Sequence, residues 1–284
     1  MKQLYLPTKY EQKMLEDLSI YEYLLLRQIT KLHETESITN YTRERLTHLI
    51  SEKLVTAQYT HRPSRTGKAP LCYSLTGKGK KLFSEKEDEK TLGGGNIDHT
   101  IQVNDVLIAG VRLEKKEQRI RLFEMRTEHQ FKQHPIQLGK SEYLAPDGWQ
   151  HFRLSPPYGK PGEPLGVAWE IDRASEDMYK IREKIRRYCT LAGGLHREVF
   201  GIDSLSIAFV VTESGVRRLQ QLLTWARQEL KHMDEEKDLF LFIAVDDTSA
   251  IDPLTFYFQP VWYHPFEKVR KTLVEKISHS RTVV

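Results

Sequence analysis

Three carboxylates stand in or at the end of two apolar runs of the sequence. Asp147 follows a proline in the run LAPDGWQHFRL, and Glu170 and Asp172 end the run LGVAWEID. Side chains two residues apart on a strand share a face, so we expect Glu170 and Asp172 to look into one cleft beside Asp147. Converging carboxylates supply the oxygen ligands that a hard divalent cation prefers. We therefore expect Asp147 and Glu170 to be able to hold Mg²⁺ or Mn²⁺.

A basic helix is expected directly after the second run. Lys180, Lys184 and Tyr188 are spaced four residues apart, which places them on one helix face. Lys184 is the candidate to stabilise charge on a phosphate beside the metal. The candidate catalytic residues are therefore Asp147, Glu170, Asp172 and Lys184. The same cleft is expected to hold five more polar side chains: His99, Asn104, Arg173, Lys180 and Tyr188.

This arrangement of strand carboxylates and lysine resembles the PD-(D/E)xK nuclease fold. One departure counts against cleavage, because Asp172 stands two positions after Glu170, where the nuclease pattern has lysine. Crowded carboxylates also need a neutralising partner. That partner is either a divalent metal, which makes the chain a DNA endonuclease, or an internal ion pair with Arg173 or Lys184, which makes the domain a nuclease scaffold without cleavage.

The elements that must position these residues follow one another from the middle of the chain. Apolar periodicity and turn residues predict the following order: a helix at 98–113, strands at 119–131, 143–154 and 165–172, a helix from residue 175, a strand at 205–212, a helix at 215–231, and strands at 239–247 and 256–263. Helix, three strands, helix and strand is the order of the PD-(D/E)xK core. We therefore predict an α/β domain with a mixed central sheet over residues 97–284.

The amino-terminal third has a different character. Its first 82 residues hold fourteen Lys and Arg against eight Asp and Glu, a net charge of about +6, whereas the whole chain carries +4. Helical spacing, then alternation around the turn RPSRTGKAP, predicts three helices followed by a strand, a basic hairpin and a returning strand. This order and the ending YSLTGKG resemble bacterial winged helix-turn-helix domains. We assign residues 1–84 to such a domain.

The winged helix resemblance implies binding to double-stranded DNA. The helix from Thr42 to Leu54 would enter the major groove, and the hairpin would touch phosphate or the minor groove. The alternative is a protein-interaction domain with a solvated basic face. The candidate DNA-binding residues are Thr42, Arg43, Arg45, Thr47, His48, Arg62, Arg65 and Lys68.

Between the two predicted domains lies a linker at residues 85–96, which contains a mixed charge run and Gly93–Gly95. The chain has 284 residues, of which 39% are hydrophobic and 29% charged, as expected for two domains with buried cores. No apolar run approaches the ~18 residues that a membrane span needs. The first residues lack the apolar segment of a signal peptide. We expect a cytoplasmic protein without membrane contact.

Three stretches together resemble the replication-relaxation family of plasmids and integrative elements. They are HTIQVNDV, LAPDGW and WEIDRASEDMYKIREKIRRY. The resemblance implies a winged helix joined to a nuclease-like domain, and a DNA-handling role in plasmid replication, DNA relaxation or transfer. It also implies replication or relaxase proteins as partners and leaves a homodimer open. Two rival functions remain: a metal-dependent nickase, and a transcriptional repressor whose second domain dimerises or senses a ligand.

Overall fold

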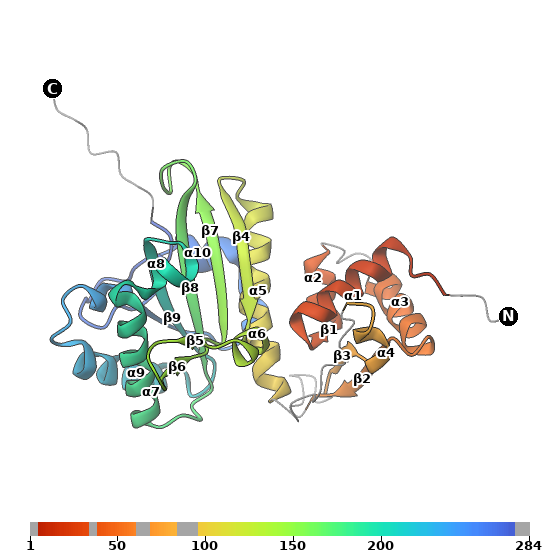
Figure 1. The fold of residues 1–284 in the computed structure, drawn as a ribbon, viewed down its shortest axis with the longest axis horizontal. Helices are drawn as coiled ribbons and strands as arrows, with labels where there is room; N and C mark the ends of the chain where they lie inside the picture. The colour runs from red at the N-terminus through yellow and green to blue at the C-terminus, as the bar shows by residue number, and fades with distance from the viewer. Residues whose placement is uncertain (1–4, 34–38, 61–68, 84–95, 276–284) are drawn as a thin grey trace. The chain divides into compact units, whose positions relative to one another are not determined.

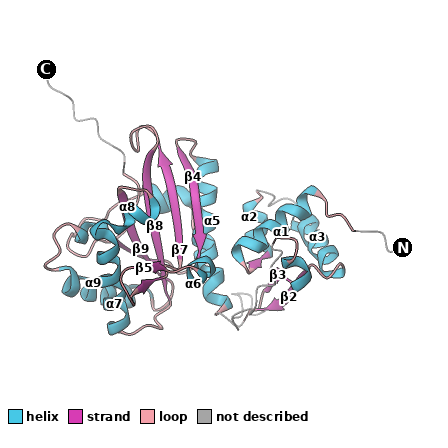
Figure 2. Cartoon of the chain, viewed as in Figure 1, coloured by secondary structure: helices cyan, strands magenta, loops and turns pink. Residues whose placement is uncertain are grey.

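The computed structural model describes residues 5–33, 39–60, 69–83 and 96–275 (Figures 1 and 2). By its internal contacts, the chain divides into a first unit, residues 1–108, and a second unit, residues 109–284. The predicted linker lies almost wholly outside the described residues, so its boundaries stay a prediction.

The first unit combines short helices with a small antiparallel sheet. Its elements are α1 (Lys9–Tyr21), β1 (Leu24–Leu25), α2 (Leu26–Leu32), α3 (Thr39–Ser51), β2 (Val55–Tyr59), β3 (Leu71–Leu75), α4 (Gly77–Lys80) and the first part of α5 (Ile97–Lys116). The three strands lie in the order β1-β3-β2. The strands after α3 follow the predicted order, but the helices differ. The first helix was predicted over residues 20–32, whereas α1 ends at Tyr21 and the rest of that stretch forms β1 and α2. The short second helix predicted at residues 37–38 lies outside the described residues.

Local sequence signals explain where these helices begin. Thr8 and Glu11 form a capping box at the start of α1, in which each side chain accepts a hydrogen bond from the other residue's backbone N–H. Thr76 caps α4 in the same way by accepting from the N–H of Gly79. Glycine is needed at that position, because a Cβ on Gly79 would lie 2.2 Å from the carbonyl oxygen of Leu54. The helix α4 is thereby held close to Leu54, the residue that precedes β2.

The first part of α5 packs within the first unit. Both carboxylate oxygens of Asp105 accept from the guanidinium of Arg27, at 2.5 and 2.9 Å. The buried amide of Gln28 donates to Asp105 and to the carbonyl of Ile101. These bonds fix one helix end against α2, so the contacts assign residues 97–108 to this unit.

The second unit is built around a mixed sheet. Its helices are the rest of α5, α6 (Glu128–Gln133), α7 (Met178–Thr190), α8 (His196–Phe200), α9 (Gly215–Leu230) and α10 (Pro253–Phe258). Its strands are β4 (Ile120–Thr127), β5 (Ile136–Gln137), β6 (Tyr143–Leu144), β7 (Gly148–Leu154), β8 (Glu163–Asp172), β9 (Ser204–Val211) and β10 (Phe240–Ala244). Helix, three long strands, helix and strand is the order that the nuclease-like interpretation predicted.

Five strands form the central sheet in the order β10-β9-β8-β7-β4. β8 pairs antiparallel with β7 and parallel with β9, so the sheet is mixed, as predicted. Helices α7, α8 and α9 cover one face, and α10 lies on the other (Figure 1). Because β7 and β8 run in opposite directions, the first residues of β7 and the last residues of β8 lie next to each other at the same end of the sheet.

Alternation along the strands separates the residues that pack on each face. Trp149 stacks on Phe200 on the face of α7, α8 and α9, whereas Trp169 packs against Phe256 of α10. Between them, Gln150 accepts from the indole of Trp169 and points to the second face. The side chains of β7 and β8 are buried on both faces, as expected for strands in the middle of a covered sheet.

Three predicted strands differ from the structure. The strand predicted at 143–154 is divided into β6 and β7, which are separated by residues 145–147. Residues 256–263 were predicted as a strand, but α10 covers 253–258, with Asp252 accepting from the N–H of Thr255 and Pro253 at the first helical position. The strand predicted at 119–131 stops at Thr127, where the short helix α6 begins.

Candidate functional site

The candidate site lies on the face of the sheet that α7 and α9 cover, at the end of the sheet where β7 starts and β8 ends. Asp147 precedes β7, and Glu170 lies near the end of β8. Lys184, on α7, places its Nζ 2.7 Å from Glu170 Oε2 and 3.1 Å from Glu176 Oε2. Tyr188, one turn later on α7, donates its hydroxyl to Glu170 Oε1 at 2.5 Å. The structure thus brings together Asp147, Glu170, Lys184 and Tyr188.

Asp147 is anchored to the backbone of β8. Its Oδ2 accepts from the N–H of Ile171 at 2.7 Å, across the β7–β8 edge. Asp147 is 9% exposed and Glu170 only 2%. The two carboxylates are therefore held close together in a partly dry environment, where like charges repel strongly.

Burial and neighbouring charge set the protonation of this group. Burial, together with the charge of Asp147, raises the pKa of Glu170 to about 7, although Lys184 opposes the shift. Burial disfavours the charged ammonium, but Glu170, Asp147 and Glu176 outweigh it and raise the pKa of Lys184. Burial and Glu170 also raise the pKa of the Tyr188 hydroxyl. The ammonium of Lys184 thus interacts with three carboxylates, and Glu170 changes its charge near neutral pH.

Asp172 belongs to a different contact. Its two carboxylate oxygens accept from Arg218 of α9 at 2.7 and 2.8 Å, and the same guanidinium donates to the carbonyl of Glu176. Asp172 and Arg218 are each 5% exposed. This bidentate pair ties β8 to α9, and both oxygens of Asp172 are engaged. Asp172 shares the face of Glu170, as predicted, but it is neutralised by an arginine that the sequence reading did not identify.

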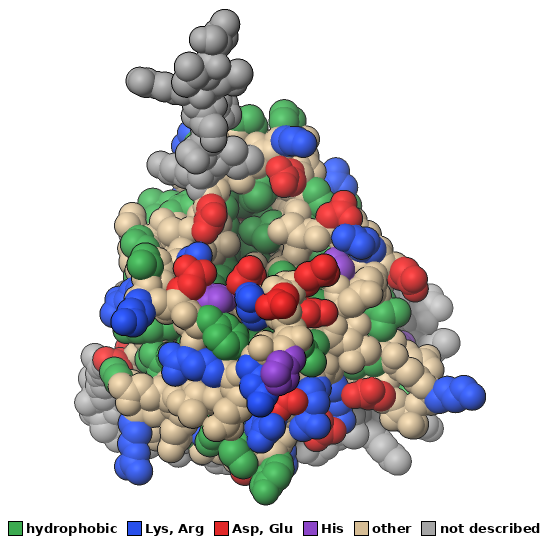
Figure 3. Space-filling model, turned by 90° about the vertical axis from the view of Figure 1, so that its left-hand side faces the viewer, with side chains coloured by type: hydrophobic (Ala, Val, Ile, Leu, Met, Phe, Trp, Pro, Cys, Tyr) green, Lys and Arg blue, Asp and Glu red, His purple; other side chains and the backbone are tan. Residues whose placement is uncertain are grey.

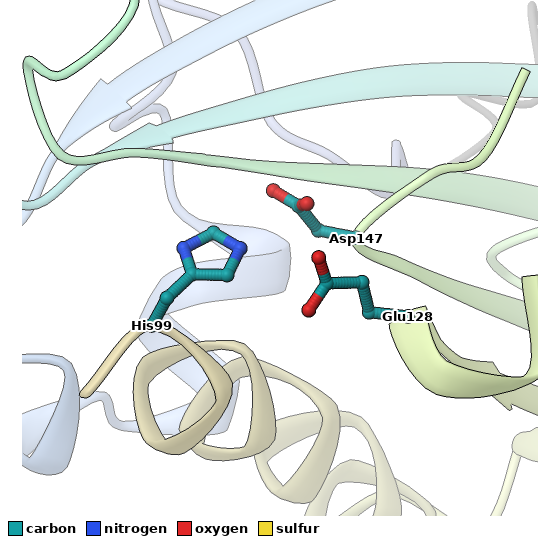
Figure 4. A group of neighbouring side chains, drawn as sticks. All are labelled: His99, Glu128 and Asp147. Carbon is teal, nitrogen blue, oxygen red and sulfur yellow. The ribbon is translucent and has the colours of Figure 1, made fainter. Parts of the chain in front are cut away.

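A further carboxylate of the second unit lies beside Asp147. A carboxylate oxygen of Glu128, the first residue of α6, lies within 4.8 Å of one from Asp147 (Figure 4). Glu128 also forms an ion pair with Lys132, one helical turn later. The sequence analysis did not identify Glu128, because residues 119–131 were predicted as one strand and the approach of Glu128 to Asp147 depends on tertiary packing. His99, also labelled in Figure 4, stands in the first turn of α5 and is counted with the first unit.

Three other residues predicted for the cleft have other positions or partners. Arg173 donates to Glu213 at 2.9 Å, because alternation turns it away from the face of Glu170 and Asp172. Lys180 is exposed on α7. The Asn104 amide donates to the carbonyls of Tyr21 and Tyr23 within the first unit.

The outer surface of α7 and α9 carries both signs of charge, as the face in Figure 3 shows. Glu229 of α9 pairs with Arg182 at 2.6 Å and with Arg186 at 3.1 Å. These pairs neutralise basic residues of α7 that point away from Glu170. The basic residues of α7 therefore lie on two faces of the helix. Arg182 and Arg186 join α7 to α9, and Lys184 reaches the buried carboxylate of Glu170.

In the first unit, α3 carries the residues predicted to contact DNA. Arg43 and Thr47 are exposed on the helix. Arg45 lies over the ring of Tyr41, 3.9 Å from Glu11. His48 Nδ1 lies 2.8 Å from the buried carboxylate of Glu11. Arg43 and Thr47 are thus the predicted α3 contacts that lie fully on the surface.

One of these expectations is wrong. Thr42 was expected on an outer face of its helix, but it is fully buried, and its hydroxyl forms a 2.7 Å hydrogen bond with the hydroxyl of Tyr10 on α1. The tyrosine provides the polar partner that lets a threonine face inward. The predicted hairpin residues Arg62, Arg65 and Lys68 lie outside the described residues.

Comparison with known protein families identifies the family of the chain. Residues 15–202, about two thirds of the chain, match the family described as replication-relaxation. The chain belongs to the replication-relaxation family. The matched residues contain α3 and the whole cluster of Asp147, Glu170 and Lys184. The resemblance seen in the sequence is therefore confirmed.

Other comparisons add little to the family assignment. A search of curated proteins found no match. Among solved structures, the restriction endonuclease FokI shares 11% identity at a TM-score of 0.29. The alignment covers 89% of this chain but spans only 46% of the length of that one. This similarity is too weak to support an argument. Within the described residues, no helix is long and apolar enough to cross a membrane.

Proposed function

We propose that this member of the replication-relaxation family is a DNA-binding protein that acts in replication, relaxation or transfer of plasmid or mobile-element DNA. The observation that carries the proposal is the family match, which spans both units. Its partners would be double-stranded DNA and the replication or relaxase proteins of the same element. The geometry of the first unit supplies the mechanism.

In this proposal the first unit is a winged helix and α3 is its recognition helix. Arg43 and Thr47 lie one helical turn apart on the exposed side of α3, which suits contacts in the major groove. Buried Leu46 and Leu49 hold the opposite side of α3 in the core. The hairpin arginines and lysine after β2 would add phosphate contacts, which strengthen binding without reading sequence.

Duplex binding by the full chain tests this proposal. We expect Arg43→Ala to weaken binding to a preferred duplex by about tenfold, the effect of roughly 1–3 kcal/mol expected for a base contact. Lys13→Ala is the matched control, because Lys13 is an exposed cation of α1 and its loss changes the net charge equally. Measurement of fluorescence anisotropy over a series of salt concentrations would decide. Equal affinities for the wild type and Arg43→Ala would overturn the assignment of α3.

A second function, metal-dependent DNA endonuclease, is favoured by one observation: three carboxylates surround the single ammonium of Lys184, and the pKa of Glu170 is raised to about 7. The donor set fits the ion, since Asp147, Glu128 and Glu170 offer the oxygen ligands that Mg²⁺ and Mn²⁺ take. Against this fit, both Glu170 oxygens already accept hydrogen bonds, from Lys184 and Tyr188. Metal binding would therefore weaken an existing ion pair.

In this second function, Asp147 and Glu170 would hold the ion and Glu128 would stand beside Asp147. A bound divalent cation supplies a more acidic water and a positive charge next to phosphate. Lys184 would stabilise negative charge on the scissile phosphate, and Tyr188 would keep Glu170 turned toward Lys184. Asp172 would serve only to fix the end of β8, through its pair with Arg218.

Calorimetry with Mn²⁺, together with nicking of supercoiled plasmid, separates the two functions. An endonuclease should bind Mn²⁺ and nick DNA, and Asp147→Asn should abolish both. Glu198→Gln, which removes an exposed carboxylate of α8, is the control and should change neither. Absence of Mn²⁺ binding by the wild type would exclude the endonuclease and leave the DNA-binding role intact.

A further inference from the structure

Away from the carboxylate cluster, the edge of the central sheet carries a strip of basic and aromatic side chains. β4 is the edge strand, and it pairs antiparallel with β7. Arg121 of β4 lies directly opposite Arg153 of β7, and both side chains are exposed. Like charges directly opposite each other destabilise a strand pair. Within the described residues, neither guanidinium forms an ion pair.

Phe123 is a bulge residue within β4, on this strip. It is the extra residue where the β4–β7 register shifts between Leu122 and Glu124, and its side chain is 59% exposed. Bulges at sheet edges redirect a side chain from its regular alternation. Here the guanidinium of Arg153 lies 3.9 Å from the centre of the Phe123 ring. An exposed aromatic ring stacked on arginine is thus held in place beside two unpaired positive charges.

A buried imidazole underlies the ring. His151 of β7 is 5% exposed, and its ring meets Phe123 edge to face with centroids 5.0 Å apart. Neither nitrogen of His151 bonds to another described residue. A buried polar group without a hydrogen-bond partner destabilises the folded protein unless a ligand supplies that hydrogen bond. The one acid on this strip, Glu124, is already paired with Arg126.

We propose that this strip binds single-stranded DNA. The two guanidiniums suit phosphate groups, and the Phe123 ring suits stacking by a base, the combination by which proteins hold single strands without reading sequence. The strip also lies on the same face as the carboxylate cluster, since Arg153 and Asp147 are six residues apart on or just before β7. At about 3.3 Å per strand residue they are roughly 20 Å apart. A strand bound along β4, which is only partly buried, would therefore run toward the end of the sheet at which Asp147 lies.

Binding of labelled oligothymidylate by the full chain tests this proposal. Arg121→Ala/Arg153→Ala should weaken binding about tenfold and lower the slope of log affinity against log salt by about 1.4, because each single-strand phosphate contact contributes about 0.7. Phe123→Ala should weaken binding by a similar factor and leave the slope unchanged, because stacking releases no ions. Arg119→Ala is the matched control: Arg119 is also an exposed arginine near the start of β4, but it is already paired with Glu117.

The outcomes separate this proposal from the role of α3. The proposal would be overturned if the double variant and Phe123→Ala both kept the wild-type affinity for single-stranded DNA. It would also be overturned if Arg119→Ala lost as much of that affinity as the double variant. A matching loss of duplex affinity in the double variant would show that the strip holds duplex rather than single-stranded DNA, and would also overturn it. Arg43→Ala should affect duplex binding alone. If α3 proves not to be the recognition helix, the oligothymidylate measurement still tests the strip by itself.

Discussion

The ammonium of Lys184 lies 2.7 Å from Glu170 Oε2, and Asp147 lies close enough to both to shift their pKa values. This ion pair joins α7 to the end of β8 beneath the covering helices. Because three carboxylates compete for one ammonium, the pair is sensitive to pH and to the removal of any partner.

Removal of the ammonium should destabilise the protein most at high pH. Lys184→Met leaves Glu170 buried without a cation, and we expect a loss of about 2–3 kcal/mol at pH above 7. The loss is smaller than for a fully buried pair, because 24% of the Lys184 side chain is exposed. Below the pKa of Glu170 the carboxyl is neutral, so the loss should shrink. Urea unfolding of both proteins on either side of pH 7 measures it; a loss independent of pH would contradict the role of Glu170.

The raised pKa of Glu170 has its own signature. An unfolded glutamate ionises near 4.5 and Glu170 in the folded protein near 7, so the folded state binds more protons between these values. Stability contributed by this group is therefore present below pH 4.5 and falls as pH rises toward 7, by at most about 3 kcal/mol. Glu170→Gln should flatten that fall, whereas Glu198→Gln should keep the wild-type profile. Unfolding midpoints across this range provide the measurement.

The Asp172–Arg218 pair should show strong coupling. Arg218→Met leaves a buried carboxylate without its bidentate partner, and we expect a cost of about 3–5 kcal/mol. Asp172→Asn/Arg218→Met removes both charges and should be more stable than Arg218→Met alone. A double-mutant cycle by chemical unfolding gives the coupling energy. Additive effects would show that the two side chains do not depend on each other.

Buried Thr42 distinguishes packing from DNA contact on α3. Thr42→Val keeps the shape but removes the hydrogen bond to Tyr10, which should cost about 1 kcal/mol. Duplex affinity should stay at the wild-type value, in contrast with Arg43→Ala. A thermal melt and a binding curve on the same sample suffice. Tenfold weaker DNA binding by Thr42→Val, without a change in stability, would place Thr42 at the DNA.

The sequence predicted the elements whose signals are local. The apolar run ending in Asp172 correctly predicted β8. The four-residue spacing of Lys184 and Tyr188 correctly placed both on one helix face, where each forms a hydrogen bond with Glu170. Such signals need only strand alternation or helix periodicity. The aromatic residues at 256–263 predicted a strand through their β propensity, whereas the chain forms α10, which begins at the Asp252 cap and Pro253.

Partners that are distant in sequence could not be predicted in this way. Arg218 bonds Asp172 across 46 positions, and Tyr10 bonds Thr42 across 32. Nothing in the spacing of either pair marks it, since only the packing of α9 on the sheet, and of α1 on α3, brings them together. Glu128 was missed for the same reason. Periodicity identifies the face of a residue, whereas its partner depends on the tertiary arrangement.

The pairing of β8 with both neighbours constrains how this family can vary in length. Trp169 and Glu170 are adjacent but point to opposite faces, one against Phe256 and the other to Lys184. A single inserted residue before them would exchange those faces, sending a carboxylate into the aromatic layer and an indole toward the lysine. Gains and losses of residues are therefore expected to accumulate in the connection at 155–162, and to be absent within Glu163–Asp172.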